Sequence, residues 1–304
     1  MKVLIIGLPY FAKKVANSLT ESDNKNQYLF FNTYEGKFDK LRFLCNLLSA
    51  DVVYSIGGAI AGSKAINLAL YLRKRVVMHW TGTDVLNAVS DFRCGKVNKR
   101  FIAEISHFCE APWFLNELEV IGIKANILRI IGFKMATEEF SEFPSKFSVF
   151  SYVGKGREKF YGIDEIIQLA NDFPDVEVKL AGISRYATPI PKNLKLLGWV
   201  DDMNAQYKDC VLFLRLPKHD GLSYSVREAL VNGRYVGYSY KMAHTLYTPS
   251  YSKLKEIVLE LKKQHEQGFL KVNAAGSIYV KENYSEDVVN LTLSKKLENI
   301  AGLV

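Results

Sequence analysis

The first half of the chain alternates short, almost continuously apolar runs with longer segments in which apolar residues recur every three or four positions. A run such as KVLIIG, residues 2–7, is typical of a strand buried on both faces of a parallel sheet. In the next segment Phe11, Val15 and Leu19 share one face of a helix. This pattern predicts strands at 2–7, 27–31, 51–58, 75–80, 107–111 and 125–131, and helices at 11–19, 38–48, 63–72 and 97–105.

The alternation is interrupted at residues 138–147, EEFSEFPSKF, a polar and acidic stretch that contains Pro144 and predicts a linker. It then resumes in the second half. The order of strands and helices predicts an α/β protein with two Rossmann-like, doubly wound parallel-sheet domains, at 1–140 and 141–285. The second half has predicted strands at 147–154, 176–182, 193–200, 211–217 and 234–240, and predicted helices at 162–173, 202–209, 225–233, 251–264 and 285–300.

The predicted helix 38–48 also carries an apolar stripe, which we expect to face the core. Cys45 lies in this stripe, and Cys109 lies in another apolar run, so both are predicted to be small core residues. The stripe consists of Phe38, Leu41, Leu44, Cys45 and Leu48.

Composition is that of a soluble globular protein, with 304 residues, 48% hydrophobic and 24% charged. No apolar stretch reaches the roughly 18 residues that a membrane span needs, and the N-terminus does not resemble a signal peptide. The four cysteines form no CxxC pair, which favours a cytoplasmic location. The net charge of +8 favours an anionic partner, but the cations are not interleaved with aromatic residues as in nucleic-acid-binding modules, so we expect no nucleic acid.

Several common cofactor motifs are missing. The loop after residues 2–7 lacks the glycines of a dinucleotide fingerprint, and the chain has no P-loop and no Asp-x-Asp. The five histidines show no metal-ligand spacing. We therefore expect neither a resident cofactor nor a metal site.

Two loops of the second half carry the candidate chemistry. In YVGKGREKFYG, residues 152–162, cations follow a predicted strand; in HDGLSYSVREALVNG, residues 219–233, Asp220 precedes a predicted helix that contains Glu228. The start of a helix offers unpaired backbone N–H groups and a positive dipole end, both suited to a phosphate. Gly221 permits close approach of the backbone. The candidate phosphate ligands are the cations Lys155, Arg157 and Lys159 and the backbone of Leu222, Ser223 and Tyr224.

This order of parts resembles the retaining glycosyltransferases of the GT-B fold, in the glycogen-synthase-like family four. That family has two glutamates separated by seven residues, in a pattern of the form EGFGLxxxEAMxxGxPV. Asp220 and Glu228 match the two acids, although Asp220 is one methylene shorter than the usual Glu. EALVNGRYV matches the remainder, except that Arg234 and Tyr235 replace the Gly-Pro-like step. The resemblance covers most of residues 148–300 and implies two domains that face each other across a cleft. It also implies that a C-terminal helix, 286–304, crosses back to the first domain.

The resemblance further implies roles for single residues. Asp220 would bind hydroxyl groups of the donor sugar as a catalytic residue, and Glu228 would bind the ribose. Trp199, at the end of LLGW, would lie where the nucleotide base binds. The segment HWTGTDV, 79–85, resembles a loop of the first domain that places His79 at the cleft, in contact with the donor sugar or the acceptor. The acceptor loop beside it consists of Thr81, Gly82, Thr83 and Asp84.

We therefore expect an enzyme that moves a sugar from a UDP- or GDP-type nucleotide sugar to a glycan or lipid-linked acceptor, without a metal and with retention of configuration. Each candidate residue also has a structural interpretation: Asp220 and Asp84 as helix caps, Glu228 as a surface acid and His79 as a hydrogen-bonded histidine at the end of a strand. The basic charge suggests peripheral contact with an anionic membrane, on its cytoplasmic face. Two alternatives stay open, a nucleotide-sugar epimerase of the same fold and a non-enzymatic protein that binds nucleotides or polyanions.

Overall fold

The computed structural model describes residues 1–133 and 141–303, which form two compact units. Unit 1 comprises the described residues up to 133 together with 283–303, and unit 2 comprises 141–282. Three residues of the predicted linker, 138–140, lie outside the described residues. Its remaining part belongs to unit 2, where Phe147 is buried.

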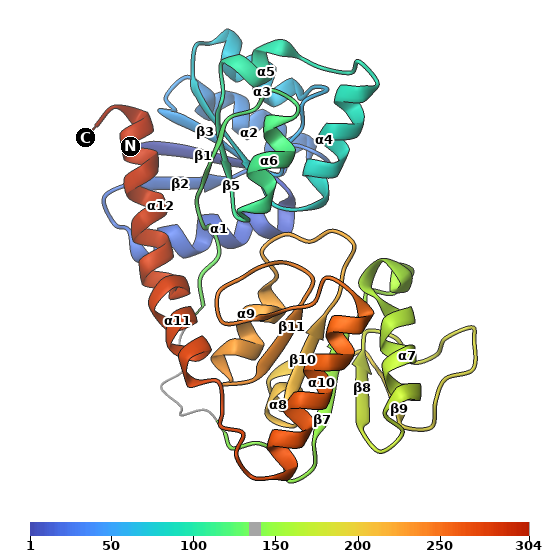
Figure 1. Cartoon of the computed structure of the whole chain (residues 1–304). Coiled ribbons are helices and arrows are strands. Elements are labelled where there is room, and N and C mark those ends of the chain that lie inside the picture. The colour runs from blue at the N-terminus through green and yellow to red at the C-terminus, as the bar shows by residue number, and fades with distance from the viewer. Residues whose placement is uncertain (134–140, 304) are drawn as a thin grey trace. The chain divides into compact units, whose positions relative to one another are not determined.

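Unit 1 is built on a six-stranded sheet with the order β2-β1-β3-β4-β5-β6, and every pairing in it is parallel (Figure 1). Its strands are β1 (Lys2–Gly7), β2 (Gln27–Phe30), β3 (Val52–Ile56), β4 (Arg75–Trp80), β5 (Ser106–Cys109) and β6 (Ala125–Ile127). Its helices are α1 (Pro9–Ser22), α2 (Lys37–Leu47), α3 (Lys64–Tyr71), α4 (Thr83–Arg93), α5 (Lys99–Ala103), α6 (Trp113–Glu119) and α12 (Glu286–Ala301).

The C-terminal helix α12 packs on α1 within unit 1. Ser18 on α1 donates a hydrogen bond to the carboxylate of Glu286 at 2.6 Å and also bonds Asn290. Val289, Leu293 and other apolar residues of α12 are buried. The last helix is thus joined to the first across almost the whole length of the chain.

The prediction for α2 was wrong about its buried face. Phe43 and Leu47 pack into the core, and the whole predicted stripe, Cys45 included, is exposed to solvent. The helix has apolar residues on two faces, so periodicity located the helix but could not choose which face the sheet covers. Cys109 is buried as predicted.

Unit 2 contains a second all-parallel sheet, with the order β12-β11-β10-β7-β8-β9. The predicted fold class, α/β with two Rossmann-like parallel-sheet domains, is confirmed. The strands are β7 (Ser148–Tyr152), β8 (Glu177–Ala181), β9 (Leu194–Gly198), β10 (Leu212–Arg215), β11 (Tyr235–Tyr238) and β12 (Leu246–Tyr247). The helices are the 3-10 turn η1 (Glu158–Tyr161), α7 (Ile163–Asp172), α8 (Met203–Lys208), α9 (Tyr224–Val231), α10 (Tyr251–Glu266) and α11 (Ala274–Tyr284), whose last two residues belong to unit 1.

Strands β7 and β10 are neighbours at the centre of this sheet, and their carboxyl ends carry the two candidate loops. The hydroxyl of Ser151 in β7 donates to the carbonyl of Leu214 in β10 at 2.9 Å, which ties the two strands together below the loops. Across residues 1–133 and 141–303, no helix is long and apolar enough to span a bilayer.

Candidate functional site

The loops that follow β7 and β10 are packed against each other. The backbone N–H of Lys218 donates to the carbonyl of Phe160 at 2.9 Å. Gly162 has a φ of +82°, and a side chain there would come within 2.7 Å of the Leu216 carbonyl. Only glycine accommodates both that backbone conformation and that close approach. The cation loop is therefore fixed beside the loop that contains Asp220.

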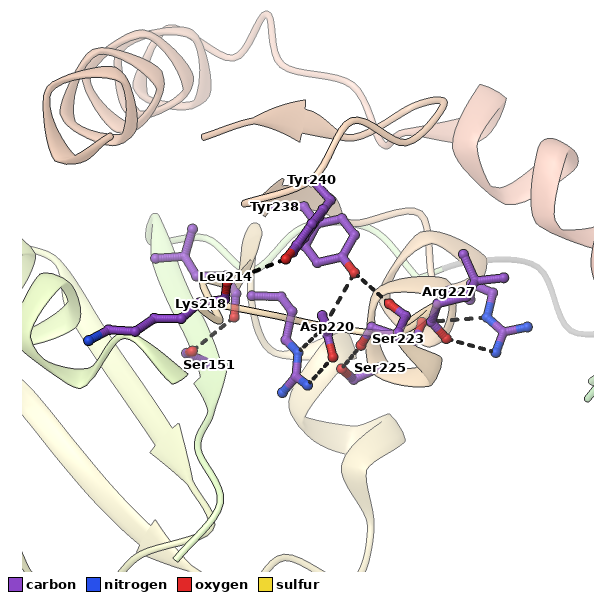
Figure 2. Close-up of polar contacts among 12 residues, drawn as sticks. Ser151, Leu214, Lys218, Asp220, Ser223, Ser225, Arg227, Tyr238 and Tyr240 are labelled. Carbon is purple, nitrogen blue, oxygen red and sulfur yellow. Dashed lines mark hydrogen bonds and ion pairs between the residues drawn. The ribbon is translucent and has the colours of Figure 1, made fainter. Parts of the chain in front are cut away.

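Asp220 binds an arginine that the sequence did not single out. Its two carboxylate oxygens accept hydrogen bonds from Nε and Nη2 of Arg215, the last residue of β10, at 2.8 and 3.0 Å. The hydroxyl of Tyr238 on the adjacent strand β11 lies 3.3 Å from the same carboxylate and donates to the Gly221 carbonyl at 3.0 Å (Figure 2). This arrangement orients both the carboxylate and the backbone on which α9 begins.

The Arg215–Asp220 pair is largely shielded from water, with side chains about one tenth exposed. Burial by itself would lower the pKa of Arg215, but the neighbouring Asp220 carboxylate more than offsets this and the pKa is raised. Burial, and then the same carboxylate, raise the pKa of the Tyr238 hydroxyl. Arg215 therefore stays charged, and Tyr238 stays a neutral hydrogen-bond donor.

Aromatic rings connect this pair to the cation loop. The Arg215 guanidinium lies 4.5 Å from the centre of the Tyr161 ring. On the other side, Arg157 lies over Phe160 at 4.2 Å and within 5.5 Å of Tyr161. Lys155 and Lys159 are exposed on the same loop. Arg157 is thus held by two rings, which distinguishes it from the two lysines.

Helix α9 begins directly after this cluster. Ser223 occupies its N-cap position, and the Ser223 and Ser225 hydroxyls are hydrogen bonded to each other at 2.9 Å (Figure 2). Leu222 and Ser223 are buried, and Tyr224 is half-buried. The first backbone N–H groups of a helix have no acceptor within the helix itself. The segment from Asp220 to Tyr224 thus combines a charged pair with a helix N-terminus.

Glu228 lies one turn further along α9 and is half-buried. Its carboxylate accepts a hydrogen bond at 3.0 Å from the hydroxyl of Tyr207, a buried residue of α8. Burial raises the pKa of Tyr207, and the Glu228 charge adds to the effect, so the tyrosine remains a donor. Glu228 is therefore not the freely exposed surface acid that its structural interpretation assumed.

Trp199 follows β9 at the same edge of the sheet, separated from β7 by β8. Its side chain is 80% exposed, and its indole N–H donates to Asp201 at 2.8 Å. One face of the ring is therefore accessible to a planar ligand.

His79 is placed differently from the expectation. It lies in β4 and is completely buried, whereas the resemblance implied a side chain at a ligand cleft. Its Nδ1 is 2.9 Å from the Tyr54 hydroxyl, and burial lowers the pKa of the imidazole to about 3. His79 is thus a neutral core residue of unit 1 in this structure, and a contact with sugar requires it to become exposed.

The loop after β4 is organised around Asp84. The Asp84 carboxylate accepts hydrogen bonds from the backbone N–H groups of Gly58, Thr81 and Gly82, at distances from 2.6 to 3.2 Å. Burial raises its pKa, and these hydrogen bonds act in the opposite direction. Of the two interpretations left open, the geometry favours a structural acid at the start of α4. Thr83, beside it, is exposed.

Arg234 was noted only as a departure from the family pattern, and the structure gives it a role. It is fully buried and donates to the carbonyls of Asn232, Cys210, Glu142 and Ser141. The arginine thereby binds Ser141 and Glu142, which belong to the predicted linker, to the strands of unit 2. The sequence contained one signal for this role, namely an arginine within a predicted strand. A guanidinium buried there needs several hydrogen-bond acceptors nearby.

Comparison with known proteins gives a structural likeness only. No family model matches the sequence, and no curated protein matches it. Anabaena Alr3699/HepE, solved with UDP-glucose, is 13% identical, with a TM-score of 0.70 over 98% of this chain and 100% of the other. Sucrose-phosphate synthase from Thermosynechococcus elongatus is 9% identical, with a TM-score of 0.69 over both whole chains. The pneumococcal O-GlcNAc transferase GtfA, solved with UDP and GlcNAc, gives 0.56 at 12% identity, over 87% and 60%. The chain therefore has the GT-B fold of these proteins.

Proposed function

We propose that the protein is a glycosyltransferase that uses a nucleotide-diphosphate sugar. The observation that carries the proposal is the cluster at the carboxyl ends of β7 and β10, where the Arg215–Asp220 pair adjoins both the start of α9 and a cation loop. The carboxyl edge of a parallel sheet is where α/β proteins bind ligands. The GT-B fold, shared with proteins solved bound to UDP or UDP-glucose, supports the same donor class.

The donor would be held by residues of unit 2. Its diphosphate would lie at the start of α9, near Ser223, with Arg157 and the two neighbouring lysines as counter-charges. Glu228, oriented by Tyr207, would accept hydrogen bonds from the ribose hydroxyls. Trp199 would stack on the base. UDP is the first nucleotide to test, with GDP as the second.

Asp220 has a more restricted role in this proposal than the sequence implied. Both of its oxygens bind Arg215, and one of them also lies beside the Tyr238 hydroxyl, so its main role would be to position that guanidinium. An acid shorter than the usual Glu suits this role, because the longer side chain of Arg215 would extend toward the donor in its place. The chemistry at the anomeric carbon would then be governed by the charge pair together, not by a lone carboxylate.

The reaction would proceed with retention, by front-face substitution. Negative charge grows on the diphosphate as it departs, and fixed N–H groups and cations stabilise it more in the transition state than in the ground state. The leaving diphosphate would take up the acceptor proton on the same face. We propose that these cations replace a metal and that no resident cofactor takes part.

The test is to incubate the chain with a panel of UDP- and GDP-sugars and to measure free nucleotide by mass spectrometry, with and without EDTA. Slow release of nucleotide that persists in EDTA and is lost in Glu228→Ala supports the proposal. Glu256→Ala, at an exposed acid on α10, is the matched control. Interconversion of the sugar would indicate the epimerase instead, and binding without turnover would indicate a nucleotide-binding protein.

The acceptor would be a glycan or a lipid-linked glycan bound by unit 1, beside the loop that contains Thr81, Gly82 and Thr83. We propose a cytoplasmic protein that meets such an acceptor at an anionic membrane, because the chain carries a net charge of +8. Adding membrane extracts to the nucleotide-release assay would test this, since a suitable acceptor accelerates release.

A further inference from the structure

Helix α2 presents an apolar face to solvent. Phe38 is 75% exposed and Leu48 is 73% exposed, and Leu41 and Leu44 between them are about half exposed. At 3.6 residues per turn these four residues and Cys45 fall within an arc of about 120°, opposite the buried Phe43 and Leu47. We call these five exposed residues, Phe38, Leu41, Leu44, Cys45 and Leu48, the α2 surface.

Cations border the α2 surface on both sides. The helical position of Lys40 is next to one edge and that of Arg42 is next to the other, while Lys37, at the start of the helix, falls within the arc near Leu44; all three cations are exposed. The acid on this helix, Asp39, is largely engaged with Arg42 and with the backbone N–H of Asn32. An apolar stripe between cations is the pattern of a helix that lies in the interface of an anionic bilayer, with its lysine stems extended toward the headgroups.

More positive charge lies at the C-terminal end of the helix. The Lys74 ammonium donates to the carbonyls of Leu48 and Ala50, at 2.6 and 3.0 Å. Tyr71 on α3 is 77% exposed, and Arg73 beside it is exposed. Positive charge thus continues from α2 to the turn that follows α3.

We propose that the α2 surface docks on an anionic lipid bilayer. The helix has 11 residues, about 16 Å, so it would lie in the plane of the interface and would not cross it. Its apolar side chains would enter the region of the acyl chains, and Lys37, Lys40 and Arg42 would meet the phosphate groups. A protein partner is less favoured, because a protein interface is depleted of lysine at its core. This inference extends the proposed membrane contact and places it on unit 1, the unit to which the acceptor was assigned.

Flotation with vesicles tests the proposal without any sugar nucleotide, so its result is independent of transferase activity. Phosphatidylcholine vesicles with and without phosphatidylglycerol are compared. We expect binding that depends on phosphatidylglycerol and weakens with salt. Phe38→Ser with Leu48→Ser should reduce binding about tenfold, and so should Lys37→Gln with Lys40→Gln. Phe269→Ser, which changes a 74% exposed residue of unit 2, and Lys263→Gln with Lys271→Gln are the matched controls.

Cys45 gives a second readout in a chain with the native apolar stripe. The substitution Cys94→Ser removes the other exposed cysteine, so that an environment-sensitive fluorophore can be attached at Cys45 alone. Anionic vesicles should shift its emission to the blue, and lipid-borne quenchers should quench it. Three results would each overturn the proposal. They are equal binding to both kinds of vesicle, a probe emission that does not shift, and control variants that bind as weakly as the α2 variants. So would sedimentation showing a dimer that the α2 variants abolish, because the α2 surface would then be an interface between copies.

Discussion

Asp220 holds Arg215 through two hydrogen bonds, five residues apart, where β10 ends and the loop before α9 begins. The pair is largely shielded from water, and the arginine also lies over Tyr161 of the neighbouring loop. A single side chain therefore connects β10, the cation loop and the start of α9. The family pattern that residues 148–300 resemble has Glu at the position of Asp220, so this shorter acid and its arginine partner are best understood together.

Breaking the Arg215–Asp220 pair should destabilise unit 2. Asp220→Ala leaves a buried guanidinium without its counter-charge, which costs about 3 to 5 kcal/mol. Arg215→Met with Asp220→Ala removes both charges and should cost less than the sum of Arg215→Met and Asp220→Ala measured singly. Urea unfolding of the two single variants and the double variant measures this coupling. Strictly additive losses would show that the two residues do not act as a pair.

Glu228→Gln should weaken UDP binding about tenfold, because an amide accepts ribose hydroxyls less well than a carboxylate does. Tyr207→Phe should have a smaller effect, about threefold, since it removes only the group that orients Glu228. Titration calorimetry with UDP measures both changes. Glu256→Gln is the control, and equal affinity in all four proteins would rule out a ribose contact at Glu228.

Among the three cations of the loop, Arg157 should matter most for the diphosphate. Phe160 and Tyr161 hold its side chain, so little freedom is lost when it meets a phosphate. Arg157→Ala should weaken binding of UDP about tenfold, and Arg157→Lys should restore it only partly. Lys155→Ala and Lys159→Ala should each cost less, and their effects should vanish in high salt. A larger loss at either lysine would assign the phosphate contact there.

His79 should make unit 1 less stable in acid. Its pKa is about 3 in the folded protein and about 6.5 when unfolded, so below pH 6.5 the unfolded chain binds the extra proton. The free energy of unfolding should therefore fall by about 2 kcal/mol between pH 7 and pH 5 through this residue alone. His107, whose pKa burial lowers to about 4, acts in the same direction.

Fluorescence of the buried Trp80 can follow this unfolding once Trp113 and Trp199 are replaced by Phe. In His79→Gln the decrease between pH 7 and pH 5 should become smaller by about 2 kcal/mol. An unchanged pH dependence would mean that His79 is not a neutral buried residue.

The sequence predicted the parallel strands well because a strand buried on both faces must be apolar at nearly every position. KVLIIG and FSVFSY left few other interpretations, and β1 and β7 lie within them. It also predicted the helix 225–233, which corresponds to α9. Helix α4 was given no range from the sequence, which indicated it only through the interpretation of Asp84 as a helix cap.

Tertiary structure decided the contacts between residues that periodicity cannot relate. When a helix has apolar residues on two faces, its sequence does not determine which face packs against the sheet. The wrong face of α2 was therefore predicted to be buried. Burial of His79 depends on β3 and β5 packing on both sides of β4. The pairing of Asp220 with Arg215 depends on how the chain turns after β10. Local sequence determined which segments form strands and helices, whereas packing between segments determined which side chains are buried, charged or available to a ligand.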